Sequence, residues 1–359
     1  MTDGQEMELG FFSPKLEEMT APQVVRFGVA LCDALLAQRP ERGWHGALYP
    51  HNIRYKDGAV TLFDTAAVEA MHEVFRDVAA RATGGADGGF RVKGIHAAYV
   101  KSSLDELGAV EVEDNEAVRW RETAAARNRE AGARLEPVAL GELDGVLRPY
   151  QKQGVYWMRF LEKAGLSGLL ADEMGLGKTL QTLAWLTLPR LALAPGERLP
   201  SLIVCPTSLV RNWEAEAQRF TPQLKVLVVS GPDRAQRFGE IAAADLVVTS
   251  YALLQRDFEA AYAAQEFAAV VLDEAQHIKN RRTRNAVTAK GLRCRQRLVL
   301  TGTPVENSVA DVWSIFDFLM SDYLNDYESF KLGYEDPIAA GGMLAEDAQA
   351  RLKRKLHPF

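Results

Sequence analysis

Cysteine is scarce in this chain, and long apolar stretches are absent. The 359 residues include three scattered cysteines without metal-ligand spacing: Cys32, Cys205 and Cys294. Their number and spacing argue against a disulfide framework or a zinc site and fit a reducing cytoplasm. The longest apolar stretch, residues 183–193, is broken by Pro189 and Arg190, so it does not predict a membrane span. The first residues also lack the charged-then-apolar pattern of a signal peptide.

The chain also lacks the excess of positive charge that is typical of nucleic-acid-binding proteins. It has 42 basic and 48 acidic residues, a net charge of −6. Between residues 279 and 297, however, basic residues occur without any Asp or Glu: Lys279, Arg281, Arg282, Arg284, Lys290, Arg293, Arg295 and Arg297. Charge alone favours a solvated basic helix face. The position of this run beside the motifs described below favours contact with nucleic acid.

Three stretches of the chain differ in character. Residues 1–83 mix helical and strand-like patterns and form an accessory region, closed by a glycine-rich run, residues 83–89, that predicts a linker. Residues 90–145 hold a charged helical segment. From residue 146 to 359, short apolar runs alternate with amphipathic helical stretches. The runs are Ser167–Ala171, Ser201–Cys205, Lys225–Val229, Leu246–Ser250, Ala269–Asp273 and Arg297–Thr301.

This alternation predicts an α/β fold, a parallel sheet with helices on both faces. In such sheets ligands bind beyond the carboxyl ends of the strands. Functional side chains are therefore expected directly after each apolar run.

A phosphate-binding loop is predicted after the first run. The sequence DEMGLGKT, residues 172–179, leads directly into a helix. Gly175 and Gly177 let backbone amides point at phosphate oxygens, and the helix N-terminus adds positive charge. Lys178 reaches the β- and γ-phosphates, and the Thr179 hydroxyl can bind Mg²⁺. Asp172 stands where this pattern usually begins with glycine.

An acidic pair follows the fifth apolar run. Asp273 is the last residue of the apolar run 269–273, and Glu274 follows it directly. Opposite a phosphate loop, Asp273 would hold Mg²⁺ and Glu274 would orient and deprotonate the attacking water. Alone, an acidic pair is often only a solvated strand end. Together the two motifs predict ATP and Mg²⁺ as cofactors.

Six segments in order resemble the motifs of Swi/Snf-related ATPases, a branch of the superfamily-two helicases. They cover the chain from about residue 147 to its end: LRPYQKQGVYW (147–157), DEMGLGKTLQ (172–181), VCPTSLVRNW (204–213), VVTSY (247–251), LDEAQHIKN (272–280) and LTGTPVEN (300–307). The resemblance implies a RecA-like motor lobe that hydrolyses ATP while tracking along double-stranded DNA.

The resemblance also implies residue roles. Gln151 would read the adenine edge, with a buried amide that satisfies a loop as the alternative. The nucleotide-binding residues of the loop would be Met174, Gly175, Leu176, Gly177, Lys178, Thr179 and Leu180. DNA phosphates would be contacted by Thr207, Ser208, Thr249, Ser250, Lys279 and Asn280. Thr207 and Ser208 are equally expected to be helix N-caps. Hydrolysis would be coupled to DNA through Gln276, Thr301, Gly302 and Thr303. Trp157 and Trp213 are expected in the core.

The sequence departs from the family pattern in two places. Gln276 stands where the family often has His. The last residues, Leu356 to Phe359, are similar to the segment that leads into a second motor lobe, so a second RecA-like lobe with its arginine finger is expected in a longer enzyme. Near the front, residues 45–64 faintly resemble a protein-kinase loop. Because Ala47 replaces the catalytic aspartate, a hairpin in an accessory domain is expected and kinase activity is not.

The sequence thus predicts the ATP-binding lobe of a double-stranded-DNA translocase. A strand-separating or RNA helicase and a non-hydrolysing ATP-binding module are the alternatives. Protein partners and oligomeric state are not indicated by any motif.

Overall fold

The computed structural model describes two compact units, residues 1–130 and 131–359. In the first unit it describes short segments, namely residues 6–10, 53–56, 59–62, 73–74, 76–78, 81–83, 89–96, 99–100 and 103. In the second unit it describes residues 135–189, 197–302 and 309–356. Within these residues, no helix combines the length and the apolar character needed to traverse a lipid bilayer.

The N-terminal unit contains an antiparallel sheet with the strand order β1-β5-β4. Its strands are β1 (Glu6–Gly10), β4 (Arg81–Thr83) and β5 (Gly89–Lys93). Thr83 lies opposite Gly89 in the β4–β5 ladder, so the glycine-rich run connects two paired strands of one sheet. The expectation of a linker at this run is therefore wrong.

A separate hairpin in the N-terminal unit pairs β2 (Ile53–Lys56) with β3 (Ala59–Leu62). It confirms the hairpin expected within the kinase-like segment, residues 45–64, whereas residues 45–52 lie outside the described residues. Most of the helical segment predicted within residues 90–145 lies outside them as well.

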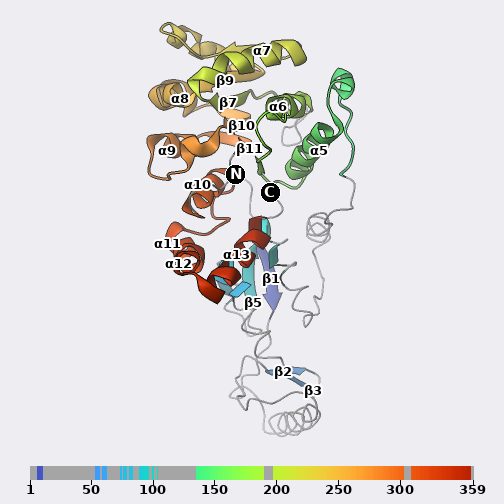
Figure 1. Ribbon diagram of the computed structural model, residues 1–359, viewed down its shortest axis with the longest axis vertical. Coiled ribbons are helices and arrows are strands. Elements are labelled where there is room, and N and C mark those ends of the chain that lie inside the picture. Colours follow the sequence, from blue (N-terminus) through green and yellow to red (C-terminus); the bar gives the residue numbers. More distant parts are fainter. Residues whose placement is uncertain are drawn as a thin grey trace. The chain divides into compact units, whose positions relative to one another are not determined.

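The C-terminal unit is built on a six-stranded sheet in which every neighbouring pair is parallel. The strand order is β6-β11-β10-β7-β9-β8, and Figure 1 labels β11, β10, β7 and β9. The strands are β6 (Gly168–Leu170), β7 (Ser201–Cys205), β8 (Val226–Val228), β9 (Leu246–Ser250), β10 (Glu266–Asp273) and β11 (Arg293–Leu300). This sheet confirms the predicted α/β class.

All six predicted strands are present, and two of them have the predicted bounds. The largest difference is β11, which begins four residues before the predicted Arg297. Three of the four residues at its start, Arg293, Arg295 and Gln296, are polar, so this part of the strand is not an apolar run. They remain in the strand because Glu266 pairs with Arg293 in the ladder and Arg295 forms an ion pair with Glu266 at 2.6 Å.

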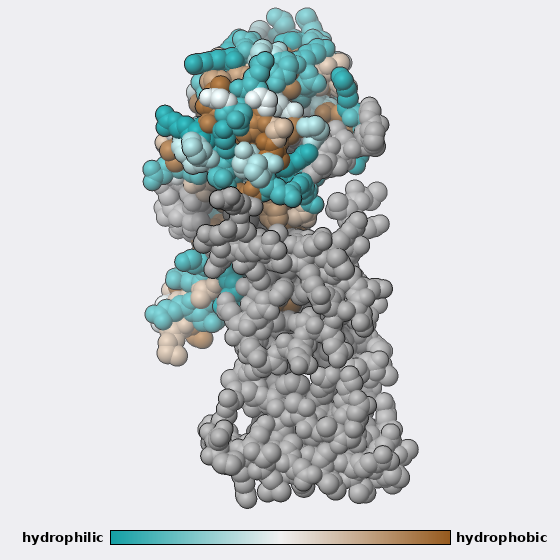
Figure 2. All heavy atoms as spheres, turned by 90° about the vertical axis from the view of Figure 1, so that its right-hand side faces the viewer, coloured by the Kyte–Doolittle hydropathy of each residue, from teal (hydrophilic) through white to brown (hydrophobic). Residues whose placement is uncertain are grey.

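Helices cover both faces of the sheet (Figure 1). Buried residues of α5 (Pro149–Lys163), α6 (Lys178–Thr187) and α7 (Val210–Phe220) share one core with every second residue of the strands. The opposite face packs against α8 (Tyr251–Asp257) and α10 (Val309–Leu319), and α9 (Arg284–Lys290) contacts both of these helices. Beyond them lie α11 (Tyr327–Phe330), α12 (Asp336–Ala340) and α13 (Gly342–Leu356). One face of the unit appears in Figure 2, where hydrophilic side chains cover most of the coloured surface.

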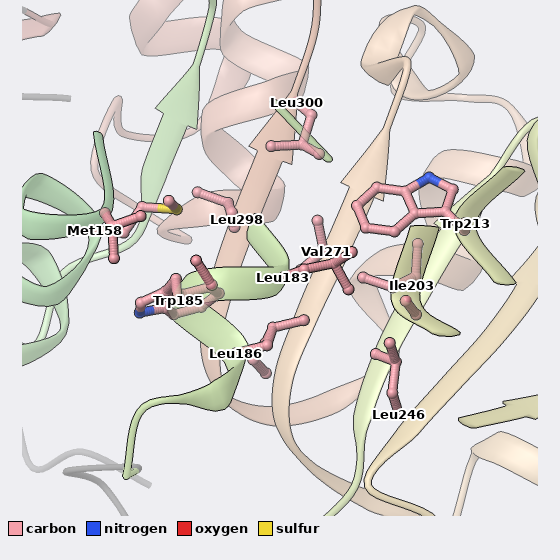
Figure 3. Packing of buried hydrophobic residues seen from close by; sticks show 14 of the residues in the cluster. Met158, Leu183, Trp185, Leu186, Ile203, Trp213, Leu246, Val271, Leu298 and Leu300 are labelled. Carbon is pink, nitrogen blue, oxygen red and sulfur yellow. The ribbon is translucent and has the colours of Figure 1, made fainter. Parts of the chain in front are cut away.

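Helix α6 is the central element of the core on its face of the sheet. Figure 3 shows Leu183 beside the strand residue Val271, with Ile203 beyond it, whereas Trp185 lies on the side of Met158 from α5. Leu183 is fully buried, so its side chain contacts packed neighbours on every side. Because the phosphate loop runs into α6, this packing fixes the base of the loop.

Replacing Leu183 with Ala should lower the free energy of unfolding by about 2–5 kcal/mol, because it leaves a cavity under α6. Urea-induced unfolding followed by circular dichroism measures this loss. The matched control is Leu332→Ala at a leucine that is 71% exposed, where a change within about 0.5 kcal/mol is expected. Equal losses for the two variants would contradict the proposed importance of the α6 core.

Candidate functional site

The phosphate loop joins β6 to α6 in a conformation that depends on two glycines. Gly175 and Gly177 have φ angles of 84° and 74°, a left-handed backbone conformation that residues with a Cβ rarely adopt. A Cβ on Gly177 would lie 2.4 Å from Gln151 Nε2. Glycine is therefore required at Gly177 by backbone conformation and by space.

The Gln151 side chain of α5 holds this loop through a hydrogen bond. Its side chain is buried, Oε1 accepts a hydrogen bond from the Arg148 amide at 2.9 Å, and Nε2 donates to the Leu176 carbonyl at 3.1 Å. This arrangement is the alternative expected for Gln151, a buried amide that satisfies a loop. Adenine recognition by Gln151 stays a prediction.

Asp172, the departure from the phosphate-loop pattern, has a structural partner. Its carboxylate accepts a hydrogen bond from Gln181 Nε2 at 3.2 Å, and the same amide lies 3.4 Å from the Leu176 carbonyl. Gln181 on α6 thus links both ends of the loop. Gln181 is the last residue of the motif DEMGLGKTLQ, but sequence reasoning gave it no role because a motif does not show which loop groups its side chain contacts.

Lys178 is the first residue of α6, and its side chain lies along the loop. Lys178 Nζ donates to the carbonyl oxygens of Asp172 at 2.7 Å and Glu173 at 3.1 Å. Its charge is close enough to favour the ionised form of Asp273. Thr179 follows at the helix N-terminus, and Met174 is 78% exposed on the outside of the loop.

Asp273 ends the central strand β10 with both carboxylate oxygens engaged. Oδ2 accepts a hydrogen bond from Trp213 Nε1 at 2.8 Å, and Oδ1 accepts one from the Glu274 amide at 3.0 Å. The backbone oxygen of Asp273 also accepts from the Tyr251 hydroxyl at 2.9 Å. Burial raises the pKa of Asp273 above its usual range, against the opposing effect of the Trp213 hydrogen bond.

Glu274 departs from regular strand geometry immediately after Asp273. Its φ of 54° and ψ of 63° place a residue with a side chain in the left-handed region. Such strain costs about 1–3 kcal/mol and concentrates at functional sites. It turns the chain sharply after β10, so the partly exposed Glu274 leaves the line of the strand.

These residues fit ATP and Mg²⁺. Among the described residues, no group of three or more side chains could form a complete metal cage. Mg²⁺ does not require one, because it usually binds one or two carboxylates together with phosphate oxygens and water. Asp273 is a buried carboxylate whose charge no described ion pair neutralises.

Burial and the charge of Asp273 raise the pKa of Cys205 to about 12, so this nearby thiol stays protonated at neutral pH.

The residues predicted to contact DNA phosphates divide into exposed and buried ones. Thr207 and Ser208 are exposed in a 3-10 turn after β7, and neither hydroxyl caps a helix, so the N-cap expectation is wrong. Thr249 is fully buried and donates to the Val229 carbonyl at 3.0 Å. Ser250 is buried as the N-cap of α8. The hydroxyls of Thr249 and Ser250 are thus engaged inside the unit, which does not support phosphate contact.

Lys279 and Asn280 are exposed after β10, where the basic run begins. The run is not one uniform face. Arg295 and Lys290 form ion pairs, and the guanidinium of Arg297 donates to backbone carbonyls, including that of Leu292 at 3.1 Å. The Arg281 guanidinium carbon lies 3.8 Å from the centre of the Tyr327 ring. Within this run, residues 279–297, the exposed basic side chains for which the structure describes no ion pair are those of Lys279, Arg282, Arg284 and Arg293.

The predicted coupling segment begins at the end of β11, next to the end of β6 and the phosphate loop. The Thr301 amide donates to the Leu170 carbonyl at 3.2 Å, and a Cβ on Gly302 would lie 2.9 Å from Met174 Cγ. Gln276 is exposed next to His277, whose ring stacks on Tyr251 with centroids 4.8 Å apart. Thr303 lies outside the described residues.

Trp213 and Tyr251 are site residues that sequence reasoning missed. Trp213 is buried, which confirms its predicted place in the core, but its indole nitrogen also contacts Asp273. Tyr251 lies in the motif VVTSY, and its hydroxyl contacts the backbone of Asp273. Both residues occur within motifs of the sequence analysis. A sequence pattern does not show that Trp213 contacts a residue 60 positions away, or Tyr251 one 22 positions away.

Comparison with known proteins places this site in a family. A family model described as the SNF2-related domain matches residues 150–359. The chain therefore belongs to the SNF2-related family. It is 39% identical over 215 residues to the TATA-binding protein-associated factor MOT1 of Saccharomyces cerevisiae, a match that covers 57% of this chain and 11% of MOT1.

Two further comparisons come from prokaryotes. YwqA of Bacillus subtilis is 40% identical over 219 residues, which cover 60% of this chain and 23% of YwqA. The solved SWI2/SNF2 ATPase core of Sulfolobus solfataricus in complex with double-stranded DNA is 40% identical, with a TM-score of 0.54 over 63% of this chain and 46% of that one. The sheet is thus the RecA-like fold of SWI2/SNF2 ATPase cores. The chain spans less than a quarter of the length of MOT1 and YwqA.

Replacing Gly177 with Ala should weaken ATP binding by about tenfold or more, because the new Cβ displaces Gln151 and the loop. The control is Gly165→Ala, where φ is 65° but a Cβ would meet nothing within 4 Å. Both variants carry backbone strain of about 1–2 kcal/mol, and only Gly177→Ala should lose affinity. Unchanged binding of a fluorescent ATP analogue by Gly177→Ala would contradict the assigned loop.

Proposed function

We propose that this chain is the ATP-binding lobe of a double-stranded-DNA translocase, in which Mg²⁺-dependent ATP hydrolysis is coupled to movement along DNA. The observation that carries the proposal is the convergence of the phosphate loop and the Asp273–Glu274 pair at the carboxyl ends of β6 and β10, the two parallel strands that flank β11. Residue Asp273 pairs with Leu300, and Leu300 pairs with Leu170. The two motifs therefore start from the same level of the sheet.

Each group in this arrangement has a chemical task. The loop amides and Lys178 hold the β- and γ-phosphates, and the α6 N-terminus adds its positive end. Thr179 and Asp273 hold Mg²⁺, which would neutralise charge on the phosphate oxygens when bound. Glu274 orients the attacking water and accepts its proton. The left-handed turn at Glu274 places that carboxylate away from the strand, where a water molecule has access.

Double-stranded DNA is the partner that the related structure suggests, because the Sulfolobus ATPase core was solved with it. On this chain, Thr207, Ser208, Lys279 and Asn280 are exposed and follow strands of the same sheet. Hydroxyls, amides and ammonium groups bind backbone phosphates without reading bases. Duplex binding that is independent of sequence is therefore proposed for these residues.

A second motor lobe completes the proposed enzyme. In two-lobed motors a finger arginine from the opposite lobe stabilises charge on the transferring phosphoryl group, and such fingers are worth about a thousandfold or more in rate. Arg351 on α13 donates to Asp347 at 2.8 Å and to the Gly333 carbonyl at 3.3 Å, so it is engaged in its own helical region. We propose that this chain alone binds ATP and hydrolyses it negligibly.

Lys178→Ala should weaken ATP binding by about tenfold or more while the fold is kept, because a charge-assisted contact to phosphate is lost. Equilibrium binding of a fluorescent ATP analogue tests this expectation. The control Lys163→Ala removes the same charge from an exposed site on α5, where Lys163 pairs with Glu136. If Lys178→Ala binds ATP as tightly as the parent, the phosphate site is elsewhere.

Changing Lys279, Arg282 and Arg284 together to Gln should weaken duplex binding equally for different sequences. Each lost phosphate contact should also reduce the slope of log affinity against log salt by about one. Arg281 is left unchanged because it stacks on Tyr327. The control is Arg295→Gln, since Glu266 and Glu197 already pair with Arg295. Unchanged affinity and slope in the triple variant would show that these residues are only a solvated face.

A strand-separating helicase and a non-hydrolysing ATP-binding module are the alternatives. Separation of a labelled duplex by the complete enzyme would favour the helicase. ATP binding without turnover in a two-lobed protein would favour the module.

A further inference from the structure

Asp273 is held by side chains from two helices that follow other strands. Trp213 comes from α7, which lies beyond β7 and the exposed turn Thr207–Leu209. Tyr251 is the first residue of α8, directly after β9. Their hydrogen bonds to Asp273 measure 2.8 Å for the indole nitrogen and 2.9 Å for the hydroxyl. Three neighbouring strands of the sheet thus converge on one acidic residue.

The contact from Trp213 restricts how the carboxylate can rotate. An indole N–H only donates, and the Trp213 side chain is 1% exposed, so this buried donor would lose its hydrogen bond if the carboxylate turned away. Figure 3 shows the indole beside Ile203 and Val271, with its nitrogen on the side away from them. With the Glu274 amide on Oδ1, one lone pair of each oxygen is occupied. The remaining lone pairs have a fixed direction in which a cation can be bound.

Packing alone does not account for this arrangement. A phenylalanine would fill a comparable apolar space next to Ile203 and Val271 without placing a polar hydrogen against an acid. The buried Asp273 carboxylate gains a donor, and its backbone oxygen gains another from Tyr251. These two residues therefore act on the orientation of Asp273 and not only on the volume of the core.

We propose that Trp213 is a positioning residue for the Mg²⁺-binding carboxylate of Asp273, and that Tyr251 holds the same residue through its backbone. This inference rests on the proposed function, because it assumes that Asp273 binds the metal. Partners that orient a metal ligand typically contribute about 10-fold to 100-fold in metal affinity. Through these hydrogen bonds, α7 connects the exposed turn at Thr207–Ser208 to the metal ligand. Tyr251 of α8 connects the His277 ring to the same residue.

The chain provides a matched control in Trp185. This side chain is also 1% exposed, and its Nε1 donates to the buried Glu162 carboxylate at 3.3 Å. Glu162 belongs to α5 and forms an ion pair with Arg159, away from the acidic pair. Trp185→Phe and Trp213→Phe thus remove the same donor from the same kind of buried contact, and only one of these contacts reaches Asp273.

The test measures the affinity of the chain for a fluorescent ATP analogue by anisotropy, with Mg²⁺ and with EDTA. The parent should bind more tightly with Mg²⁺. Trp213→Phe should lower this Mg²⁺-dependent gain about tenfold or more and leave the affinity in EDTA within about twofold. Trp185→Phe should match the parent in both conditions. Tyr251→Phe should lower the gain by a smaller factor, because it frees the backbone and leaves the carboxylate contact intact.

The outcomes separate the two proposals. If Mg²⁺ gives the parent no gain in affinity, the proposed function fails. If the parent shows the gain and Trp213→Phe retains it, the positioning role is overturned while the proposed function stands. An equal loss in Trp185→Phe would also overturn the role, since it would show that replacing any buried indole has this effect. If Trp213→Phe does not fold, benzothienylalanine at position 213 keeps the bicyclic shape and replaces the N–H by sulfur, with the same expected loss.

Discussion

The parallel register of the central strands is the constraint on which the site depends. Asp273 lies opposite Leu300, Leu300 lies opposite Leu170, and Leu272 lies opposite Val204. The strands β6, β11, β10 and β7 therefore end at one level, and the loops that follow them lie side by side. A slip of one residue in any pair would turn every side chain of that strand to the other face. The buried residues on both faces oppose such a slip, so the core that stabilises the sheet also aligns the phosphate loop with the acidic pair.

Four polar side chains inside this core donate hydrogen bonds that also shape the site. Gln151 and Gln181 satisfy the Leu176 carbonyl under the loop, and Trp213 and Tyr251 satisfy Asp273. An unsatisfied buried polar group costs about 1–3 kcal/mol, so these bonds are needed for stability. They also fix the positions of the bonded groups, because moving a buried donor away from its acceptor would incur this cost. Stability and the geometry of the site thus depend on the same contacts.

The sequence was sufficient to predict the fold and the two chemical motifs. Apolar runs identified all six strands, because strands buried on both faces are continuously apolar. Gly175, Gly177 and Lys178 were recognised because a phosphate loop needs specific residues at fixed spacing. Contacts between distant segments were not predictable, and this is why Trp213 was assigned only to the core and Thr249 to DNA contact. Thr249 instead donates to the Val229 carbonyl, a partner determined by the neighbouring strand. The glycine-rich run after Thr83 failed as a linker for a related reason, since local composition does not reveal that the flanking strands pair.

The central claim is that the phosphate loop and the Asp273–Glu274 pair hydrolyse ATP when duplex DNA brings a second lobe against this one. The most direct measurement is the rate of ATP hydrolysis with and without duplex DNA. It is made on this chain alone, on a protein in which the chain continues into a second motor lobe, and on that protein with Glu274→Gln. The account predicts negligible turnover by the chain alone, DNA-stimulated turnover by the two-lobed protein, and a loss of about a hundredfold or more in the Glu274→Gln variant. Robust DNA-stimulated turnover by the chain alone, or unchanged turnover without the Glu274 carboxylate, would contradict it.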